Sequence, residues 1–147
     1  MFQLPAEGRM KAWRDFRTTL ESLTLEQALV QTAEFWAGAP FVPYNLEPDD
    51  YTKWPDPWTL IYENTYCDVA KCLGILYTVS LTTHKTAMEF RMYVDPVTKY
   101  TYNLSWFDEG KYILNMINGE VLNNTQFDKN LNLVKTHTAV DLQLDNY

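Results

Sequence analysis

Three side chains of the sequence could carry nucleophilic and acid–base chemistry: Cys67, His84 and His137. Cys67 stands at the start of a very apolar stretch with helical spacing, and a helix N-terminus favours a thiolate. Lys71, one turn later, would add to this effect, whereas the neighbouring Asp68 opposes it. A thiol nucleophile also needs a base, so the candidate depends on where the histidines lie.

Neither histidine is well spaced to serve Cys67. The helix predicted over residues 66–81 is roughly 24 Å long, and His84 follows its far end. His137 belongs to the last predicted strand, where "KTHTA" is ordinary strand sequence, so we expect a structural role for it. Cys72 lies roughly 140° around the helix from Cys67, so the two thiols cannot bridge. We expect Cys72 to be a core residue.

The elements that must position Cys67 begin with two helices, predicted over residues 9–21 and 24–38. Thr24 and Gln27 can form a capping box at the start of the second helix, and Gly38 can end it. Five prolines forbid long regular structure over residues 39–57, which we expect to form an extended, aromatic-rich loop.

A short helix then leads into the predicted central helix. Asp56 can cap it with Pro57 at its first position, and Asn64 breaks it after Glu63. The central helix over residues 66–81 is apolar nearly all round, which is typical of a buried helix.

Period-two alternation replaces helical spacing after this helix, first in "AMEFRMYV" and then in "YTYNLSWF". Three further strands are predicted in "KYILNMI", "EVLN" and "LNLVKTHTAVDLQL", with short turns between neighbours. The sequence therefore predicts one domain over residues 1–147, with a helical half at about 9–81 and a strand-rich half at about 87–144. Its expected class is α+β, with N-terminal helices and a central buried helix packed on an antiparallel β-meander.

Residues 54 to about 107 resemble the transglutaminase-like (papain-related) core. The stretch "WPDPWTLIYENTYCDVAKCLGILY" is similar to that family's Pro/Trp lead-in and cysteine helix. The resemblance implies a catalytic histidine at the start of the next strand and an acid near the end of the strand after that. The sequence has Met88, Glu89 and Phe90 in place of the histidine and Asn103 near the place of the acid. These departures argue against the family's activity, because a lost base costs about a hundredfold to ten-thousandfold in rate.

Composition excludes several other classes. A net charge of −7 argues against a nucleic-acid-binding face, since phosphate binding relies on clustered Lys and Arg. No secretory signal is visible at the N-terminus, so we do not expect secretion by a signal peptide. The longest apolar run is too short and polar to span a membrane. Asp49 and Asp50 lack further ligands at metal-binding spacing, and no glycine-rich phosphate loop is present, so we expect neither metal nor cofactor.

The leading interpretation from sequence is a non-enzymatic structural or interaction protein. Aromatic residues are 15% of the chain, and the proline-rich loop presents rigid anchors of the kind that interfaces use. The expected interface residues are Phe41, Tyr44, Tyr51, Trp54 and Trp58. The overall pattern also resembles small neck, tail or baseplate proteins of tailed bacteriophages. That resemblance implies a virion component, assembled in the host cytoplasm, whose partners are other virion proteins.

Two alternatives remain open. The first is a cysteine-dependent hydrolase or acyltransferase that uses Cys67 with His137, since nothing local excludes the return of His137 to the thiol. The second is an acidic inhibitor or nucleic-acid mimic, which rests on the net charge alone.

Overall fold

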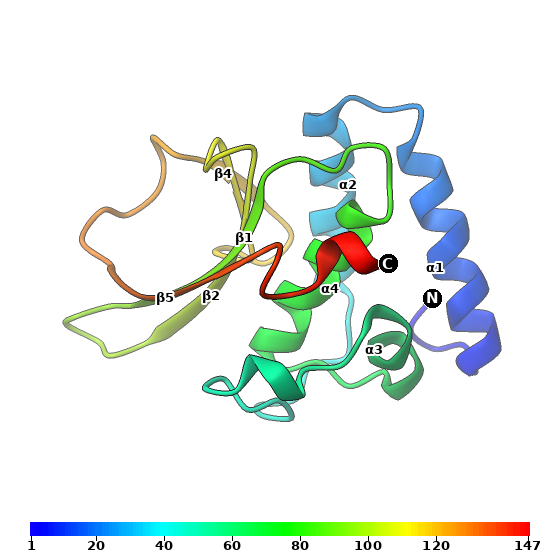
Figure 1. Cartoon of the computed structure of the whole chain (residues 1–147), viewed down its shortest axis with the longest axis horizontal. Helices are drawn as coiled ribbons and strands as arrows, with labels where there is room; N and C mark the ends of the chain where they lie inside the picture. The colour runs from blue at the N-terminus through cyan, green and yellow to red at the C-terminus, as the bar shows by residue number, and fades with distance from the viewer.

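A computed structural model describes all 147 residues and has a layer of helices packed against one sheet (Figure 1). The helices are α1 (Ala6–Leu20), α2 (Leu25–Ala37), α3 (Pro57–Glu63) and α4 (Asp68–Ser80), with short 3-10 turns η1 (Tyr51–Lys53) and η2 (Leu144–Asn146). The strands are β1 (Met88–Val94), β2 (Thr101–Phe107), β3 (Tyr112–Leu114), β4 (Val121–Asn123) and β5 (Asn132–Thr138). The α+β class expected from the sequence is confirmed.

Helices α2 and α3 begin where the sequence places their caps, whereas α1 begins at Ala6, earlier than predicted, and has no side-chain cap. Thr24 and Gln27 form the predicted capping box at the start of α2. At α3, the Asp56 carboxylate accepts a hydrogen bond of 2.7 Å from the Thr59 amide. Asn64 then ends α3 in the left-handed conformation with φ of 53°, which turns the chain towards α4. None of the helices is both long enough and apolar enough to cross a bilayer.

Helix α4 is the buried axis of the molecule, because nearly every side chain between Val69 and Ser80 is covered. Its tight contact with α2 depends on Gly74, where an added Cβ would lie 2.4 Å from the Trp36 ring. One turn on, the Thr78 hydroxyl accepts hydrogen bonds from the indoles of Trp13 (3.0 Å) and Trp36 (2.9 Å). A single hydroxyl on α4 therefore satisfies the buried indoles of both α1 and α2.

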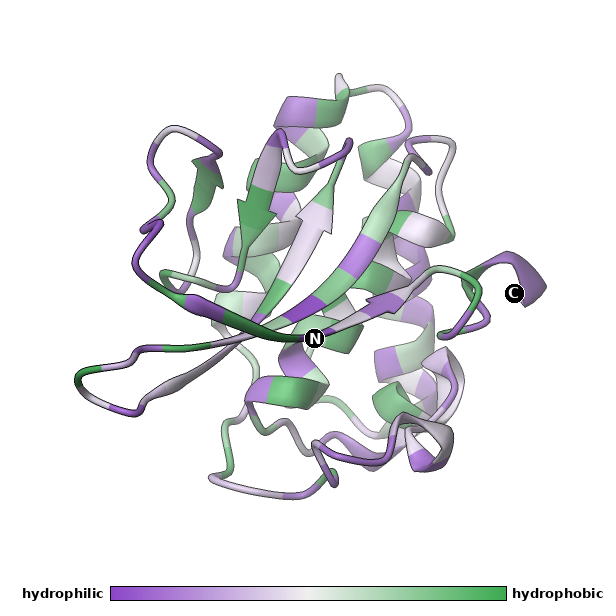
Figure 2. Ribbon diagram, turned by 60° about the vertical axis from the view of Figure 1, so that its left-hand side comes forward, coloured by the Kyte–Doolittle hydropathy of each residue, from purple (hydrophilic) through white to green (hydrophobic).

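The sheet has the order β4-β3-β2-β1-β5, and all its pairs are antiparallel. Strands β1 to β4 form the predicted meander, whereas β5 returns to the free edge of β1. Helix α4 lies against the β1 and β2 face of the sheet, and the other helices lie behind it (Figures 1 and 2). The opposite face carries a smaller apolar cluster around Tyr93, Leu104 and Ile113.

Two strands are shorter than the sequence predicts, and each ends where a local interaction takes over. Strand β3 stops at Leu114 because Asn115 adopts a left-handed conformation with φ of 73°. Strand β5 stops at Thr138, whose amide donates to the Asp141 carboxylate at 3.0 Å and starts a turn. The periodicity of residues 131–144 does not distinguish this turn from strand.

Candidate active site

The proline-rich loop is fastened to the start of α4 through Asn45. Its side-chain oxygen accepts a 2.9 Å hydrogen bond from the Cys67 amide, and its nitrogen donates to the Thr65 carbonyl at 3.0 Å. Nearby, Phe41 and Tyr66 form a parallel β-bridge. The loop therefore has a structural role that its composition alone did not indicate: it covers the residue that begins the central helix.

Cys67 lies at the start of the central helix, as the sequence predicts, and is its N-cap residue because α4 begins at Asp68 and not at residue 66. Its backbone is extended, and its thiol makes no capping hydrogen bond to the helix. The residue is 3% exposed, so the thiol is shielded from solvent. The sulfur thus stands at the positive end of the helix dipole in a site from which water is largely excluded.

Asp68 is the centre of a polar network beside the thiol. One carboxylate oxygen accepts from the amide and the side chain of Asn103, the latter at 2.8 Å, and the other accepts from Asn115 at 3.1 Å. Burial raises the pKa of the Asp68 carboxyl, while these hydrogen bonds oppose that rise. The Asn115 side chain also donates to the Asn103 carbonyl at 2.9 Å. Asp68 therefore ties the start of α4 to β2 and to the end of β3.

Asn103 has an unused acceptor at this place. Its residue is 6% exposed, and its side-chain oxygen is buried without a hydrogen-bond partner. Directly across the β1–β2 ladder from it lies Met92, also buried. The resemblance places Asn103 near the family's acid, and its bond to Asp68 sets it beside the start of α4. The residue that faces it on β1 is Met92. Met88 pairs with Phe107 at the other end of the strand.

Both histidines have partners other than the thiol. The His84 ring lies 2.6 Å from the Leu20 carbonyl. The His137 ring contacts those of Tyr51, Trp54 and Phe90, with centroid distances of 4.8 to 5.7 Å, and no hydrogen bond joins it to Cys67. Burial lowers the pKa of His137, whose Nε2 atom has no partner.

Two further groups on α4 have other partners. Cys72 is fully buried, and its sulfur lies 3.1 Å from the Ser105 hydroxyl. Burial raises the pKa of the Cys72 thiol well above its ordinary value, so this cysteine is an inert core residue. Burial also lowers the pKa of Lys71, whose ammonium donates to the Asn118 side chain at 2.5 Å. Lys71 is therefore engaged with the loop between β3 and β4.

The aromatic residues expected at an interface divide into two groups. Trp54 is part of the packed structure: its ring lies 4.9 Å from that of Phe90, and its indole donates to the Glu47 carbonyl at 2.7 Å. The other four are exposed: Phe41 at 62%, Tyr44 at 62%, Tyr51 at 38% and Trp58 at 43%.

Comparison with solved structures finds the same fold in a bacterial protein. Legionella pneumophila LapG superposes with a TM-score of 0.70 at 15% sequence identity, over 91% of this chain and 76% of that one. Its calcium-bound form gives a TM-score of 0.73 at 12% identity, over 93% and 78% of the two chains. No protein-family model matches the sequence. No curated protein matches it either.

These comparisons correct the leading interpretation from sequence. LapG has a transglutaminase-like cysteine-protease fold, so the expectation of a non-enzymatic protein is wrong, as is the expectation of a bacteriophage neck, tail or baseplate component. The bacteriophage resemblance rested on overall composition and on no particular motif. The transglutaminase-like resemblance rested on specific residues around Cys67 and was the better guide. The chain has the transglutaminase-like, papain-related fold, as the stretch around Cys67 indicated.

Proposed function

We propose that the chain is a thiol-dependent enzyme that hydrolyses or transfers acyl groups, with Cys67 as its nucleophile. The observation that carries this proposal is the position of Cys67, at the N-terminal end of the buried central helix, in a chain with the fold of LapG. In such a reaction the sulfur attacks a carbonyl carbon and the leaving group departs. The thioester that remains is then cleaved by water or by another nucleophile.

The start of α4 has groups suited to the charge that develops in this step. The first amides of a helix have no partner within it, and they favour negative charge at the reacting oxygen. Cys67 leaves those amides free, because its side chain does not cap the helix. The Asp68 network fixes the helix terminus against β2, which is the kind of support that holds a reacting group in one geometry.

No residue of the chain is assigned as the base. Met92 cannot accept a proton, and His137 is enclosed by the rings of Tyr51 and Trp54. The buried oxygen of Asn103 could orient an imidazole, but no imidazole faces it. We therefore expect slow turnover, about a hundredfold or more below that of a thiol enzyme with a positioned base.

Calcium is present in one of the LapG structures, but the start of α4 in this chain does not fit it. Calcium takes six to eight oxygen ligands. Asp68 is the one carboxylate of the network, and both its oxygens accept hydrogen bonds from amide groups. No group of three His, Cys, Asp or Glu side chains is arranged to hold a metal ion. We therefore derive no step that depends on calcium.

The test is turnover of an activated ester, p-nitrophenyl acetate, and of a mixed peptide pool by the full chain. The proposal predicts product formation above the uncatalysed rate, lost in Cys67→Ala and kept in Cys72→Ala. Thermal unfolding of both variants controls for folding, because both positions are buried. Product formation that is equal in wild type and Cys67→Ala, or absent for every substrate, would overturn the proposal.

A further inference from the structure

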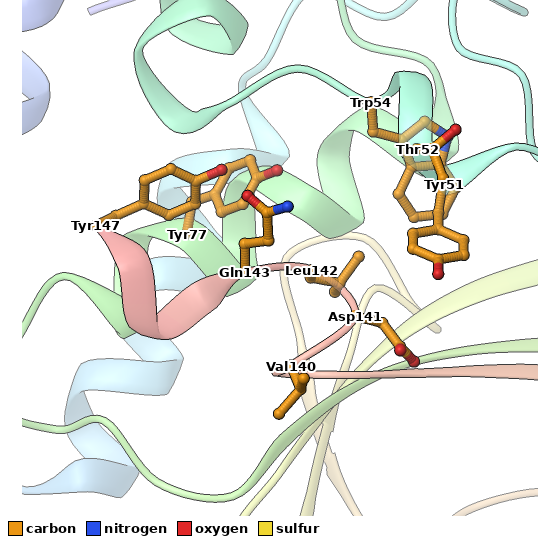
Figure 3. Close-up of a pocket in the computed structure, with 9 residues that line it drawn as sticks. All are labelled: Tyr51, Thr52, Trp54, Tyr77, Val140, Asp141, Leu142, Gln143 and Tyr147. Atoms are coloured by element: carbon orange, nitrogen blue, oxygen red, sulfur yellow. The ribbon is translucent and has the colours of Figure 1, made fainter.

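A concave site lies about the far half of α4, away from Cys67. It is a cavity of about 370 Å³, within the range of sites that take small organic ligands. Its walls come from η1, from Tyr77 of α4 and from the segment after β5 (Figure 3). Since α4 rises about 1.5 Å per residue, Tyr77 stands roughly 15 Å from the start of the helix.

Four of the nine residues that line this cavity are aromatic. Figure 3 shows Tyr77 and Tyr147 beside Gln143 at one end and Tyr51 and Trp54 near Asp141 at the other. The rings of Tyr77 and Tyr147 meet edge to face at 6.0 Å, as do those of Tyr51 and Trp54 at 6.5 Å. Ring faces carry partial negative charge and attract cations.

These walls are held in place by hydrogen bonds and neighbouring rings. The Tyr77 hydroxyl donates to the Pro55 carbonyl at 2.7 Å, and the Trp54 indole donates to the Glu47 carbonyl. Tyr51 rests on the ring of His137, where burial lowers the imidazole pKa and so favours its neutral form. The cavity is therefore preformed, which lowers the entropic cost of binding.

The charge at the cavity is negative only. Asp141 is the sole charged residue among those that line it. The nearby cations are engaged elsewhere: Lys53 pairs with Asp50, and Lys135 with Asp49. Ring faces and a carboxylate without a competing cation favour a positively charged guest.

Gln143 supplies a side-chain amide to the wall of the cavity. Its backbone has φ of 58°, in the left-handed region that glycine or asparagine normally occupies. This conformation turns the Gln143 amide towards Tyr77 (Figure 3).

We propose that this cavity binds an organic cation with an alkylammonium group, held between the aromatic rings and Asp141. The ammonium would lie against Tyr51, Trp54 and Asp141, and a polar group at the other end of the ligand would meet the Gln143 amide. The same chemistry is present in a free small molecule such as choline and in the side chain of a lysine residue. This site is independent of acyl transfer at Cys67.

The first experiment separates charge from shape by calorimetric titration of the full chain with choline and with dimethylbutanol, its neutral carbon isostere. A cation held by aromatic rings is favoured by about 2- to 30-fold over a neutral group of the same shape. We expect choline to bind tighter by a factor in this range and to shift the NMR signal of the Trp54 indole. Equal affinity for choline and dimethylbutanol would refute the proposal. So would a lack of binding by choline and by both lysine derivatives described below.

Matched variants locate the site. Tyr51→Leu removes a ring face and is expected to weaken choline binding by the same 2- to 30-fold, whereas Tyr51→Phe keeps the face and should bind like wild type. Asp141→Asn should weaken binding a few-fold and reduce its salt dependence. Unchanged affinity in both Tyr51→Leu and Asp141→Asn would place the ligand elsewhere and overturn the assignment.

A last arm distinguishes the two sources of the cation. Acetyl-lysine methylamide and its ε-trimethyl form are titrated against the same protein. Binding of either one at least as tight as that of choline identifies a peptide side chain as the guest, and preference for choline identifies a small molecule. Cys67→Ala should bind with unchanged affinity in both cases, so loss of acyl transfer leaves this inference standing.

Discussion

Replacement of Met92 by histidine should convert Cys67 into a much faster nucleophile. Met92 is 5% exposed and faces Asn103 across the β1–β2 ladder. Side chains directly opposite in such a pair have Cβ atoms about 5 Å apart. Asn103 in turn bonds to Asp68, the residue that follows Cys67. A histidine at position 92 would therefore stand between an unused acceptor on Asn103 and the thiol.

The structure allows the gain and the cost to be bounded. An imidazole N–H donating to the free Asn103 oxygen contributes about 1 kcal/mol, which offsets part of the apolar burial of about 1.5–3 kcal/mol lost with the methionine. Folded domains have about 5–15 kcal/mol of stability, so the variant should fold. A positioned base that takes the thiol proton accelerates the reaction by about a hundredfold to ten-thousandfold.

The assay is the rate of p-nitrophenol release from p-nitrophenyl acetate, with three controls. Met88→His puts the same residue on the same strand face about 13 Å away, opposite Phe107. Met92→Gln supplies a polar side chain that accepts no proton. Met92→His combined with Cys67→Ala removes the nucleophile. A folded Met92→His variant with unchanged rate, or an equal gain from Met88→His, would refute the placement of position 92 beside the thiol.

Three further predictions concern the scaffold. Thr78→Val leaves two buried indole N–H groups unpaired and should lower the unfolding free energy by about 2–5 kcal/mol in chemical denaturation. Thr78→Ser keeps the hydroxyl and should lower it far less. Equal losses in the two variants would mean that the hydroxyl does not stabilise the indoles. Asn45→Ala should release the proline-rich loop and speed alkylation of Cys67 by iodoacetamide several-fold. Asn45→Asp keeps the hydrogen-bond acceptor and should react like wild type. Identical rates in all three proteins would show that the loop does not shield the thiol. Burial lowers the pKa of His137 in the folded protein, so the unfolding free energy should fall as pH drops from the ordinary histidine pKa of 6.5 towards the lowered one. In His137→Phe the melting temperature should change less with pH over that interval. An unaltered pH dependence would assign the change to other groups.

Local signals in the sequence were sufficient for much of the fold. The capping box at Thr24 and the Asp56–Pro57 start of α3 were predicted because their hydrogen bonds are made within one turn. Apolar residues all round the chain from Val69 to Val79 identified the buried helix without any tertiary information. Features fixed within a few residues could thus be predicted from spacing alone.

The parts that were missed depend on contacts between distant segments. Asn45 reaches Cys67 across 22 residues, and Asn115 reaches Asp68 across 47. Asparagines in loops carry no signal for such partners, because their ordinary role in turns explains them equally well. Likewise, Met92 could be matched to Asn103 only once the strand register was known, since a register shift of one residue moves every side chain to the other face.

The functional error has a related cause. The spacing of residues in the sequence indicates a thiol nucleophile but no base to activate it. The absence of a base was interpreted as the absence of enzymatic activity. The fold supplies the missing context, because position and burial at a helix terminus are properties of the scaffold and not of a motif.

The central claim, that Cys67 is an acyl-accepting nucleophile, is tested most directly by locating the acyl group. The protein is mixed with p-nitrophenyl acetate, quenched in acid at successive times, and digested for peptide mass mapping. The account predicts an acetyl group on the peptide containing Cys67 that is removed by hydroxylamine, forms faster in Met92→His, and is absent from Cys72. Acetylation confined to lysines, or a native Cys67 that gains no acetyl group while product is released, would contradict it.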